Sequence, residues 1–253
     1  MSDAVTPRSS VPSIPKTILI TSNEDQSKQV DLVGGLISIA YFENLMSDTL
    51  RATITFTDTG TGSSDKIKES ILEGLPIVGQ EKVILKFEDN NKVTIGDKPE
   101  LVMYVNKVTP ISDDTRKTQI RLDLVSAEFI RNEKTRITKR YDGKISDHVK
   151  QLLTEGNSIG LKTKKDIDDI DETLNNYNYI GNNKKPFYII NWLSRKSISA
   201  QNQKKGKSAG YFFYETSKGY HFKSNDSLFA QEQKKSIIFN ETTGIPKGYD
   251  LKA

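Results

Sequence analysis

The lysine-rich segment at 201–208 is the first set of residues whose spacing could support chemistry. Its sequence, QNQKKGKS, ends like a phosphate-binding loop, but Gln201 stands where that motif has its first glycine. Without this glycine the chain does not make the tight turn that directs backbone amides at a phosphate, and no strand leads into the segment. We therefore predict a solvated lysine loop and assign no cofactor-binding residue.

The acidic run at 166–172 could coordinate calcium through its carboxylates. An EF-hand loop would need Asp or Asn in place of Ile170 and a glycine directly after it, and the sequence has neither. The run is predicted to be a charged loop in which Ile167 and Ile170 turn inward. No metal ligand is assigned.

Catalysis by histidine would depend on His148 or His221, the only two histidines in the chain. His148 falls on the flank of a predicted helix, and His221 alternates with Tyr220 and Phe222. We predict that both are half-buried, aromatic-like side chains and assign no catalytic residue. The chain has 33 acidic residues, so a pair of carboxylates with separate pKa values stays open as an alternative.

Composition excludes other kinds of site and of location. The chain has no cysteine, which excludes disulfides, thiolate nucleophiles, cysteine zinc sites and iron–sulfur clusters and is typical of a reducing compartment. Its N-terminus, MSDAVTPRSSVPSIPK, does not have the pattern of a signal peptide. No segment approaches the roughly 20 apolar residues that a membrane helix needs. We predict no membrane insertion.

Basic residues cluster locally, although the net charge of +4 is too small to indicate nucleic-acid binding. Aromatic residues that could stack on bases lie at spacings typical of a core. A basic nucleic-acid-binding module therefore stays an alternative. The two basic clusters comprise Lys134, Arg136, Lys139, Arg140 and Lys144, and then Lys204, Lys205 and Lys207.

The elements that must position these residues fall into two parts. From about residue 16 to 131, apolar side chains alternate with polar ones, as in the strand 50–56, which predicts antiparallel strands with one buried face. Further strands are predicted at 17–21, 36–42, 83–87, 101–108 and 119–124, and a short helix within 61–74. A closed barrel would leave no exposed strand edges.

The second part combines helices with a hairpin. Ile145, Val149 and Leu152 have helical spacing, and Pro186 favours the start of a second helix through FYIINWLSRKSI. YFFYE and YHFKS flank the loop TSKG and predict a β-hairpin. A last strand is predicted at SIIFN, residues 236–240.

An ordered set of motifs runs from about Arg140 to Phe229. KRYDGKISDHVKQLL is followed by YNYIGNNKKPFYIINWLSRKSIS and then by GYFFYETSKGYHFKSNDSLF. This order resembles the central baseplate hub protein of contractile-tailed bacteriophages of the T4 type. It is more distantly similar to the late-control hub proteins of other phages and to the hub part of type VI secretion spike proteins. The matching residues are Gly143, Ser146, Asp147, Pro186, Trp192, Glu215, Gly219 and Phe222.

The resemblance implies a mainly β, α+β fold. It would contain a flexible arm at 1–15, a tail-tube-like β-barrel with one helix at 16–131, and a second hub domain at 132–253. The second domain would carry two helices, a hairpin and an incomplete barrel. Hubs of this family usually continue beyond this point, so the resemblance implies a split or truncated subunit, or a partner that supplies the missing strands.

The resemblance also implies a role without catalysis. The chain would be a virion structural protein that forms a homotrimer, a ring that adapts the hexameric tail tube to the trimeric cell-puncturing spike. Its partners would be the spike protein, tail tube or tube-initiator proteins and other baseplate proteins, and phage DNA would pass through non-specifically. Assembly would take place in the host cytoplasm. A tail-associated cell-wall hydrolase is the other alternative.

Overall fold

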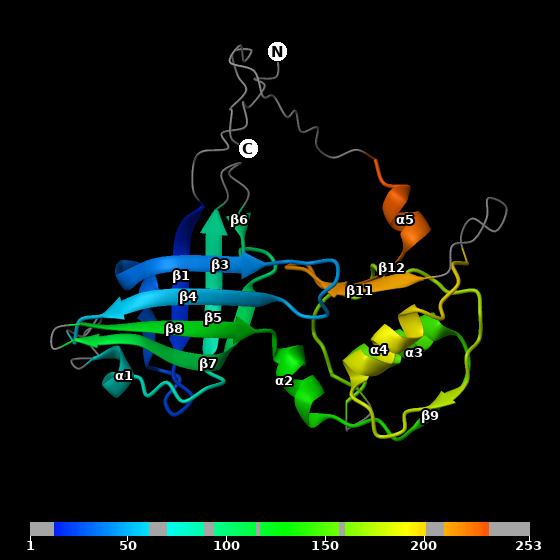
Figure 1. The fold of residues 1–253 in the computed structure, drawn as a ribbon, viewed down its shortest axis with the longest axis horizontal. Helices are drawn as coiled ribbons and strands as arrows, with labels where there is room; N and C mark the ends of the chain where they lie inside the picture. The colour runs from blue at the N-terminus through cyan, green and yellow to red at the C-terminus, as the bar shows by residue number, and fades with distance from the viewer. Residues whose placement is uncertain are drawn as a thin grey trace, which may run out of the picture.

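One antiparallel sheet dominates the first half of the chain (Figure 1). The computed structural model describes residues 13–60, 70–88, 94–114, 117–156, 160–200 and 210–232. The sheet has eight strands in the order β2-β1-β5-β7-β8-β4-β3, with β6 paired to β5. We call residues 14–125 the sheet region. Its strands are β1 (Ile14–Thr21), β2 (Gln29–Asp31), β3 (Leu36–Phe42), β4 (Arg51–Asp58), β5 (Lys82–Glu88), β6 (Thr94–Ile95), β7 (Leu101–Asp114) and β8 (Lys117–Val125).

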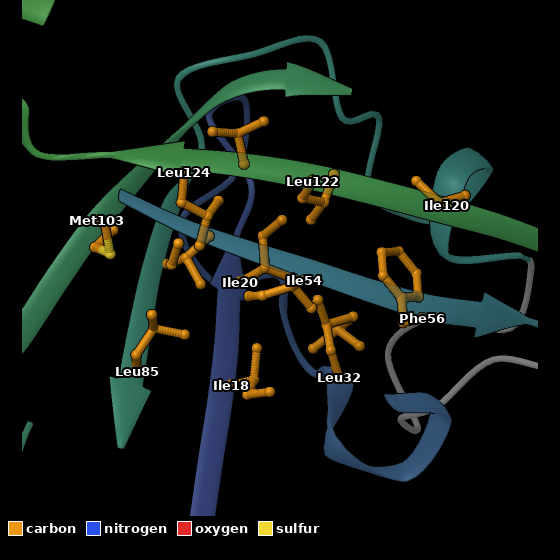
Figure 2. Packing of buried hydrophobic residues seen from close by; sticks show 14 of the residues in the cluster. Ile18, Ile20, Leu32, Ile54, Phe56, Leu85, Met103, Ile120, Leu122 and Leu124 are labelled. Carbon is orange, nitrogen blue, oxygen red and sulfur yellow. The ribbon is translucent and has the colours of Figure 1, made fainter. Parts of the chain in front are cut away.

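Alternation along the strands builds the core of this sheet. On β4 every second residue is buried, and Ile54 and Phe56 are fully inaccessible to solvent. Leu122 on β8 lies opposite Ile54 in the strand pairing and is buried with it. Figure 2 shows these side chains meeting aliphatic residues of β1, β5 and β7 inside the curved sheet. The predicted strands of the first part are thereby confirmed.

The sheet is strongly curled, so that β1 and β5 cross the direction of β4 and β8 (Figure 1). Between its two ends lies the 3₁₀ helix η1 (Leu32–Gly35), which joins β2 to β3 and packs against both β1 and β4. Buried Leu32 of η1 belongs to the core of the sheet. The mainly β, α+β fold class is thereby confirmed.

Residues 137–229, which we call the C-terminal region, have a separate hydrophobic cluster. Here the strands are short and form two two-stranded ladders, β9 with β10 and β11 with β12. Among the described residues of this region there is no further sheet. The elements are β9 (Arg140–Tyr141), α3 (Ile145–Thr154), β10 (Tyr179–Ile180), α4 (Pro186–Ser194), β11 (Tyr211–Glu215), β12 (Tyr220–Ser224) and α5 (Asn225–Phe229).

The two predicted helices of this region are present. The apolar face of α3 is buried at Ile145, Val149 and Leu152, as its spacing predicts. Pro186 is at the start of α4, but the helix ends at Ser194, before the last part of the predicted run. The Leu193 carbonyl accepts hydrogen bonds from the Lys196 amide and the Ser197 hydroxyl, and these bonds tighten the chain into a turn.

A helix that the sequence did not predict joins the two regions. This helix, α2 (Ala127–Lys134), follows β8 directly and crosses the predicted boundary at residue 131, so the division into two domains at that residue stays a prediction. Of the helix predicted within 61–74, α1 (Ile71–Gly74) is described, whereas 61–69 lie outside the described residues. The predicted arm up to residue 12, the lysine loop at 201–208 and the strand at 236–240 also lie outside them.

Candidate functional site

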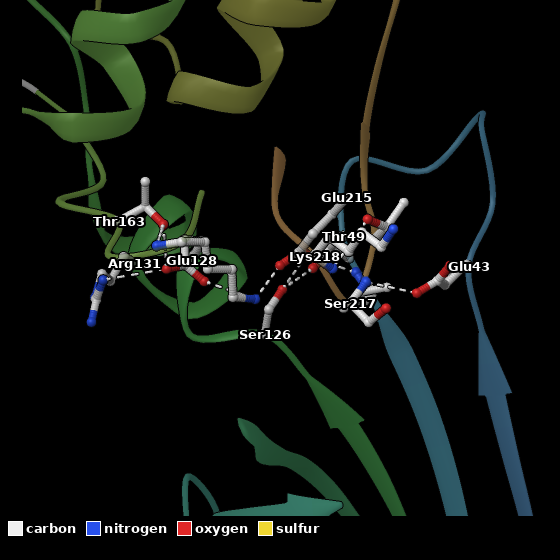
Figure 3. A network of polar contacts seen from close by, with 12 residues as sticks. Glu43, Thr49, Ser126, Glu128, Arg131, Thr163, Glu215, Ser217 and Lys218 are labelled. Carbon is white, nitrogen blue, oxygen red and sulfur yellow. Dashed lines mark hydrogen bonds and ion pairs between the residues drawn. The ribbon is translucent and has the colours of Figure 1, made fainter. Parts of the chain in front are cut away.

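A buried carboxylate lies where the sheet region meets the C-terminal region (Figure 3). Glu215, the last residue of β11, is 1% exposed. Its Oε2 atom accepts hydrogen bonds from the Leu50 amide at 2.8 Å and from the Ser126 hydroxyl at 2.6 Å. Lys165 forms an ion pair with Oε1. One side chain of the C-terminal region therefore binds both the start of β4 and the junction of β8 with α2.

Ser126 is placed at the N-terminal cap of α2 but makes no cap hydrogen bond. Its hydroxyl instead contacts Glu215 and, at 2.6 Å, the Thr49 hydroxyl. Both hydroxyl-bearing residues are buried. Capping by serine usually stabilises a helix by about 1 kcal/mol. Here the hydroxyl is used to join β11 to the sheet region.

A second buried carboxylate, Glu128 on α2, shares the same lysine. It accepts a hydrogen bond from the Thr163 hydroxyl at 2.8 Å, and Lys165 lies 3.5 Å from its other oxygen. Arg131, one turn along α2, donates hydrogen bonds to the carbonyls of Leu161 and Lys162 at 3.2 and 3.0 Å. Lys165 thus bridges a carboxylate of α2 and a carboxylate of β11.

Around this centre, further bonds cross between the regions. The Ser217 amide donates to Glu43 at 2.6 Å, and Asn191 donates to Asp48 at 3.0 Å. On α2, the side-chain oxygen of Asn132 accepts from the Phe187 amide at 2.9 Å, and Glu133 pairs with Lys185. In these contacts the acceptors belong to residues 43–133 and the donors to the C-terminal region.

Burial dominates the electrostatics of this junction. It raises the pKa of Glu215, and the charge and hydrogen bond of Lys165 oppose that rise. Burial likewise raises the pKa of Asp48 and moves that of Tyr220 well above its ordinary value. The carboxylates are enclosed by the protein's own donors, so the arrangement fixes the orientation of one region on the other.

The predicted histidines lie in two different environments. His148 is 1% exposed, more buried than predicted, and packs against Tyr141 and Tyr179. Its Nε2 atom lies 3.1 Å from the Tyr177 carbonyl, and burial lowers its pKa despite hydrogen bonds to backbone carbonyls. His148 therefore acts as a core side chain.

His221 has partners in the order of a hydrolase triad. Its Nδ1 atom lies 2.5 Å from Asp169 and its Nε2 atom 2.8 Å from the Thr216 hydroxyl. The amides next to Thr216 are already occupied, since that of Ser217 donates to Glu43 and that of Lys218 to Thr216 itself. Neither amide is therefore directed at a place where a substrate oxyanion could form.

The chain contains one G-x-S-x-G sequence, GNSIG at 156–160, of the kind that forms a nucleophile elbow. Such an elbow needs a strand before the serine and a helix after it. Here helix α3 precedes the sequence, and residues 157–159 lie outside the described residues. On the side that precedes the serine, the chain therefore has a helix where an elbow needs a strand.

The acidic run and the described basic cluster largely pair with charges of opposite sign. Asp169 and Asp171 both pair with Lys223, and Glu172 pairs with Lys144. Burial opposes ionisation of Asp169, but hydrogen bonds from Lys223 and His221 bring its pKa below the ordinary value. Ile170 is buried and Ile167 half-buried, as predicted. In the described part of the chain no group of three or more acidic or histidine residues could hold a metal ion.

Within the basic cluster, Lys139 pairs with Glu155, and Arg140 pairs with Asp142. Arg136 donates to the Glu133 and Thr135 carbonyls. These side chains therefore do not form an uncompensated basic face. The second cluster, at 204–207, lies outside the described residues.

The residues that carry the hub resemblance take structural places in the C-terminal region. Phe222 and Ser146 are buried, and Trp192 contacts Tyr177 and Tyr179. A side chain at Gly219 would come within 2.2 Å of the Asp166 carbonyl, so this close approach requires glycine. Glu215 belongs to this set, but Lys165, Glu128 and Ser126 did not stand out in the sequence. The sequence pointed to this site only indirectly: Glu215 alternates with Tyr211 and Phe213, so a charged residue occupies a core position and needs buried partners.

No protein-family model and no curated protein sequence matches the chain. Among solved structures, the 43 kDa tail protein of prophage MuSo2 from Shewanella oneidensis is similar with a TM-score of 0.51 and 11% identity, over 82% of this chain and 54% of that protein. A component of the E. coli type VI secretion system, described as structurally similar to tail proteins of bacteriophage T4, aligns with a TM-score of 0.40 and 10% identity, over 85% of this chain and 46% of that chain.

The chain thus spans about half the length of the tail protein. It shares its fold with that phage tail protein, at an identity that shows the fold alone. Among the described residues, no helix is both long and apolar enough to span a bilayer.

Proposed function

We propose that the chain is a structural subunit of the central hub of a phage tail baseplate. In this proposal it is not an enzyme. It forms a homotrimeric ring in the virion that joins the tail tube to the spike, contacts other baseplate proteins and lets phage DNA pass without reading its sequence. Assembly takes place in the host cytoplasm. The shared fold with the MuSo2 tail protein supports the proposal, and one feature of the sheet carries it further.

That feature is the edge of β3, the last strand of the sheet, which in the described part of the chain pairs with β4 and with no other strand. β3 has the sequence LISIAYF, without charge or proline, and Ile37 and Phe42 are 51% and 55% exposed. Monomeric proteins usually protect such an edge with lysine, proline or bulges, because its unpaired amides and carbonyls can pair with another chain. Only one irregularity, between Leu36 and Ser38, interrupts the pairing of β3 with β4.

The outer half of β7 shows what a protected edge looks like in the same sheet. Residues 82–85 of β5 cover only its first part, so the stretch after Val105 pairs with β8 alone. That stretch contains Lys107 and Pro110 and has two irregularities of register. Protection of one edge and exposure of the other support a partner on β3.

The test compares the full chain with two variants of matched chemistry. We expect wild-type protein to form a threefold ring, measured by light scattering after size exclusion and by electron microscopy. Lysines at the β3 edge, Ser38→Lys with Ala40→Lys, are expected to yield monomers. Thr55→Lys, on the neighbouring strand β4, should leave the ring intact. A strict monomer at high concentration that does not associate with tube or spike proteins would overturn the proposal.

The two alternatives make different predictions. A tail-associated hydrolase would clear a cell-wall suspension, and that activity would depend on the relay of Thr216, His221 and Asp169. A nucleic-acid-binding module would bind DNA with an affinity that falls steeply between two salt concentrations in a filter-binding titration. The pairing of Lys139, Lys144 and Arg140 with carboxylates argues against the second alternative.

A further inference from the structure

A surface groove runs from the outer face of the sheet to helix α2. One hollow of about 290 Å³ is bordered by Phe42, Arg51 and Lys107. A second, of about 330 Å³, is bordered by Val78, Ile130 and Glu133. Both are lined by Asn106 and Phe129, so the two hollows are neighbours, and we refer to them together as the groove, with a sheet end and a helix end.

The sheet end of the groove carries a net positive charge, although Arg51 also acts on the nearby Asp48, whose pKa it lowers against the effect of burial. Four charged side chains line it: Arg51, Lys107, Arg121 and Asp123. Asp123 is already engaged, because it pairs with Arg121 at 3.0 Å and accepts a hydrogen bond from Thr53 at 3.2 Å. Among the described residues, Arg51 and Lys107 make no side-chain hydrogen bond or ion pair. They remain available to a carboxylate from outside.

The strand pairing fixes the separation of these two cations. Arg51 on β4 pairs with Val125 of β8, and Lys107 on β7 pairs with Asp123 of the same strand. The two residues thus lie two strands apart and are offset by two residues along the sheet. At about 4.8 Å between strands and 3.4 Å per residue, their Cα atoms lie about 12 Å apart. Two long cationic side chains can reach one acidic group over that span.

The helix end of the groove combines apolar side chains with polar ones. Val78 is 81% exposed, and the side chains of Phe129 and Ile130 are half-buried beside it. At this end Glu133 is paired with Lys185, and Lys134 donates to Gln80 at 3.4 Å. The charge of Glu133 is therefore compensated, whereas Lys134 keeps its charge beside the neutral amide of Gln80. The exposed apolar surface of Val78 suits an aliphatic side chain.

We propose that this groove binds a short segment of a partner protein that carries one or two acidic residues followed by an aliphatic residue. The acidic residues lie between Arg51 and Lys107, and the aliphatic residue packs on Val78 and Phe129. Because the cations lie at the sheet end, charge complementarity places the acidic residues of the partner at that end and its aliphatic residue at the helix end. The inference does not depend on a role in a phage tail.

Other occupants fit the groove less well. A nucleic-acid backbone needs a row of cations along its path. In this groove the cations of the sheet end are accompanied by the acidic Asp123, and Lys134 at the helix end is accompanied by the acidic Glu133. A second copy of the chain would have to present an acidic, unpaired segment. The acidic run at 166–172 is partly engaged, because Asp169, Asp171 and Glu172 pair with lysines of their own chain.

The test is a selection of random displayed peptides on the immobilised full chain, with counter-selection on the charge-reversed variant Arg51→Glu with Lys107→Glu. We expect enriched peptides to contain Asp or Glu and, a few residues later, Leu, Ile or Val. A synthetic peptide of the enriched sequence should bind at least about tenfold more weakly to the charge-reversed variant, and binding should weaken as salt rises. Val78→Asp should also weaken it.

Lys117→Glu provides the matched control, because this exposed lysine lies on β8 outside the groove and should leave the affinity unchanged. Enrichment of peptides without acidic residues, equal binding to the charge-reversed variant, or no enrichment would overturn the proposal. The proposal would also be overturned if an oligothymidylate displaced the peptide with similar affinity, or if the chain dimerised through the groove and thereby displaced the peptide.

Discussion

The sheet region and the C-terminal region are stabilised in different ways. In the sheet region, eight strands hydrogen-bond side by side around a largely aliphatic core, in which two of nineteen buried cluster members are aromatic. In the C-terminal region the ladders are short, and seven of seventeen buried cluster members are aromatic. The rings form stacked pairs, such as Tyr211 with Phe222 at 4.7 Å between centroids. The second region therefore depends more on particular side-chain contacts.

The buried polar side chains of the C-terminal region also depend on particular contacts. Buried hydroxyls of the C-terminal region bond to nearby backbone groups, as Thr173 does with the Ser146 amide at 3.0 Å. Asp171 accepts from the Ser224 amide at 3.1 Å. These bonds replace the strand pairing that the sheet region has in abundance. A region organised in this way tolerates the loss of one partner poorly, because each donor has few alternatives.

The largest effect is expected where the two regions meet. Glu215→Ala removes the acceptor of the buried Leu50 amide and of the Ser126 hydroxyl and leaves Lys165 with Glu128 alone, so it should reduce the free energy of unfolding by about 3–5 kcal/mol. Urea unfolding measured by fluorescence and circular dichroism would show this loss and a separation of the two regions' transitions. Glu215→Gln should cost less, because its amide oxygen can still accept from Leu50 and Ser126.

The exposed Glu100, which pairs with Lys82 only at 4.0 Å, provides the control, and Glu100→Ala should leave stability unchanged. A free energy of unfolding of Glu215→Ala equal to that of the wild type would show that the junction does not hold the regions together.

A slightly smaller effect is expected inside the sheet. Ile54→Ala removes a fully buried side chain from the middle of β4 and should cost about 2–5 kcal/mol. Because β4 lies between β3 and β8, hydrogen exchange should accelerate in all three strands and little in α3 and α4. Uniform acceleration through both regions would contradict the division between them.

The next prediction concerns the dependence of stability on pH. Burial holds the pKa of His148 below its ordinary value of 6.5, so the unfolded chain takes up a proton there that the folded chain refuses. Its contribution to stability is therefore complete above about pH 6.5 and decreases as the pH falls toward the folded value. Unfolding titrations at several pH values should show this slope. His148→Phe, which keeps a ring against Tyr141 and Tyr179, should flatten it, and an unchanged slope would assign the effect elsewhere.

The smallest effect is expected at the surface. Arg140 pairs with Asp142 in full contact with solvent, so Arg140→Ala should leave the urea midpoint within measurement error. A clear loss of stability would show that this surface pair contributes to the C-terminal region as the buried ones do. Lys139 forms a neighbouring surface pair with Glu155. The urea midpoint of Lys139→Ala would then decide whether surface pairs in general contribute to the stability of this region.

Much of the fold could be predicted because the patterns are local. Alternation placed β4, β5 and β8, and helical spacing placed α3 and α4. The helix α2 could not be predicted in this way, since its two buried polar residues, Glu128 and Asn132, occupy the positions that an apolar stripe would fill. Its burial depends on contacts with Lys165 and Phe187, which lie far along the chain.

The sequence by itself determined which residues face inward within each strand and helix, because burial repeats with the period of the element. Glu215 was among the residues that carry the resemblance to the hub family. Only the tertiary structure decided what its carboxylate binds: the Leu50 amide, 165 residues away in the chain, and Lys165 and Ser126. The edge of β3 and the groove beside Arg51 and Lys107 were likewise decided there, since both depend on which strands become neighbours and in which register.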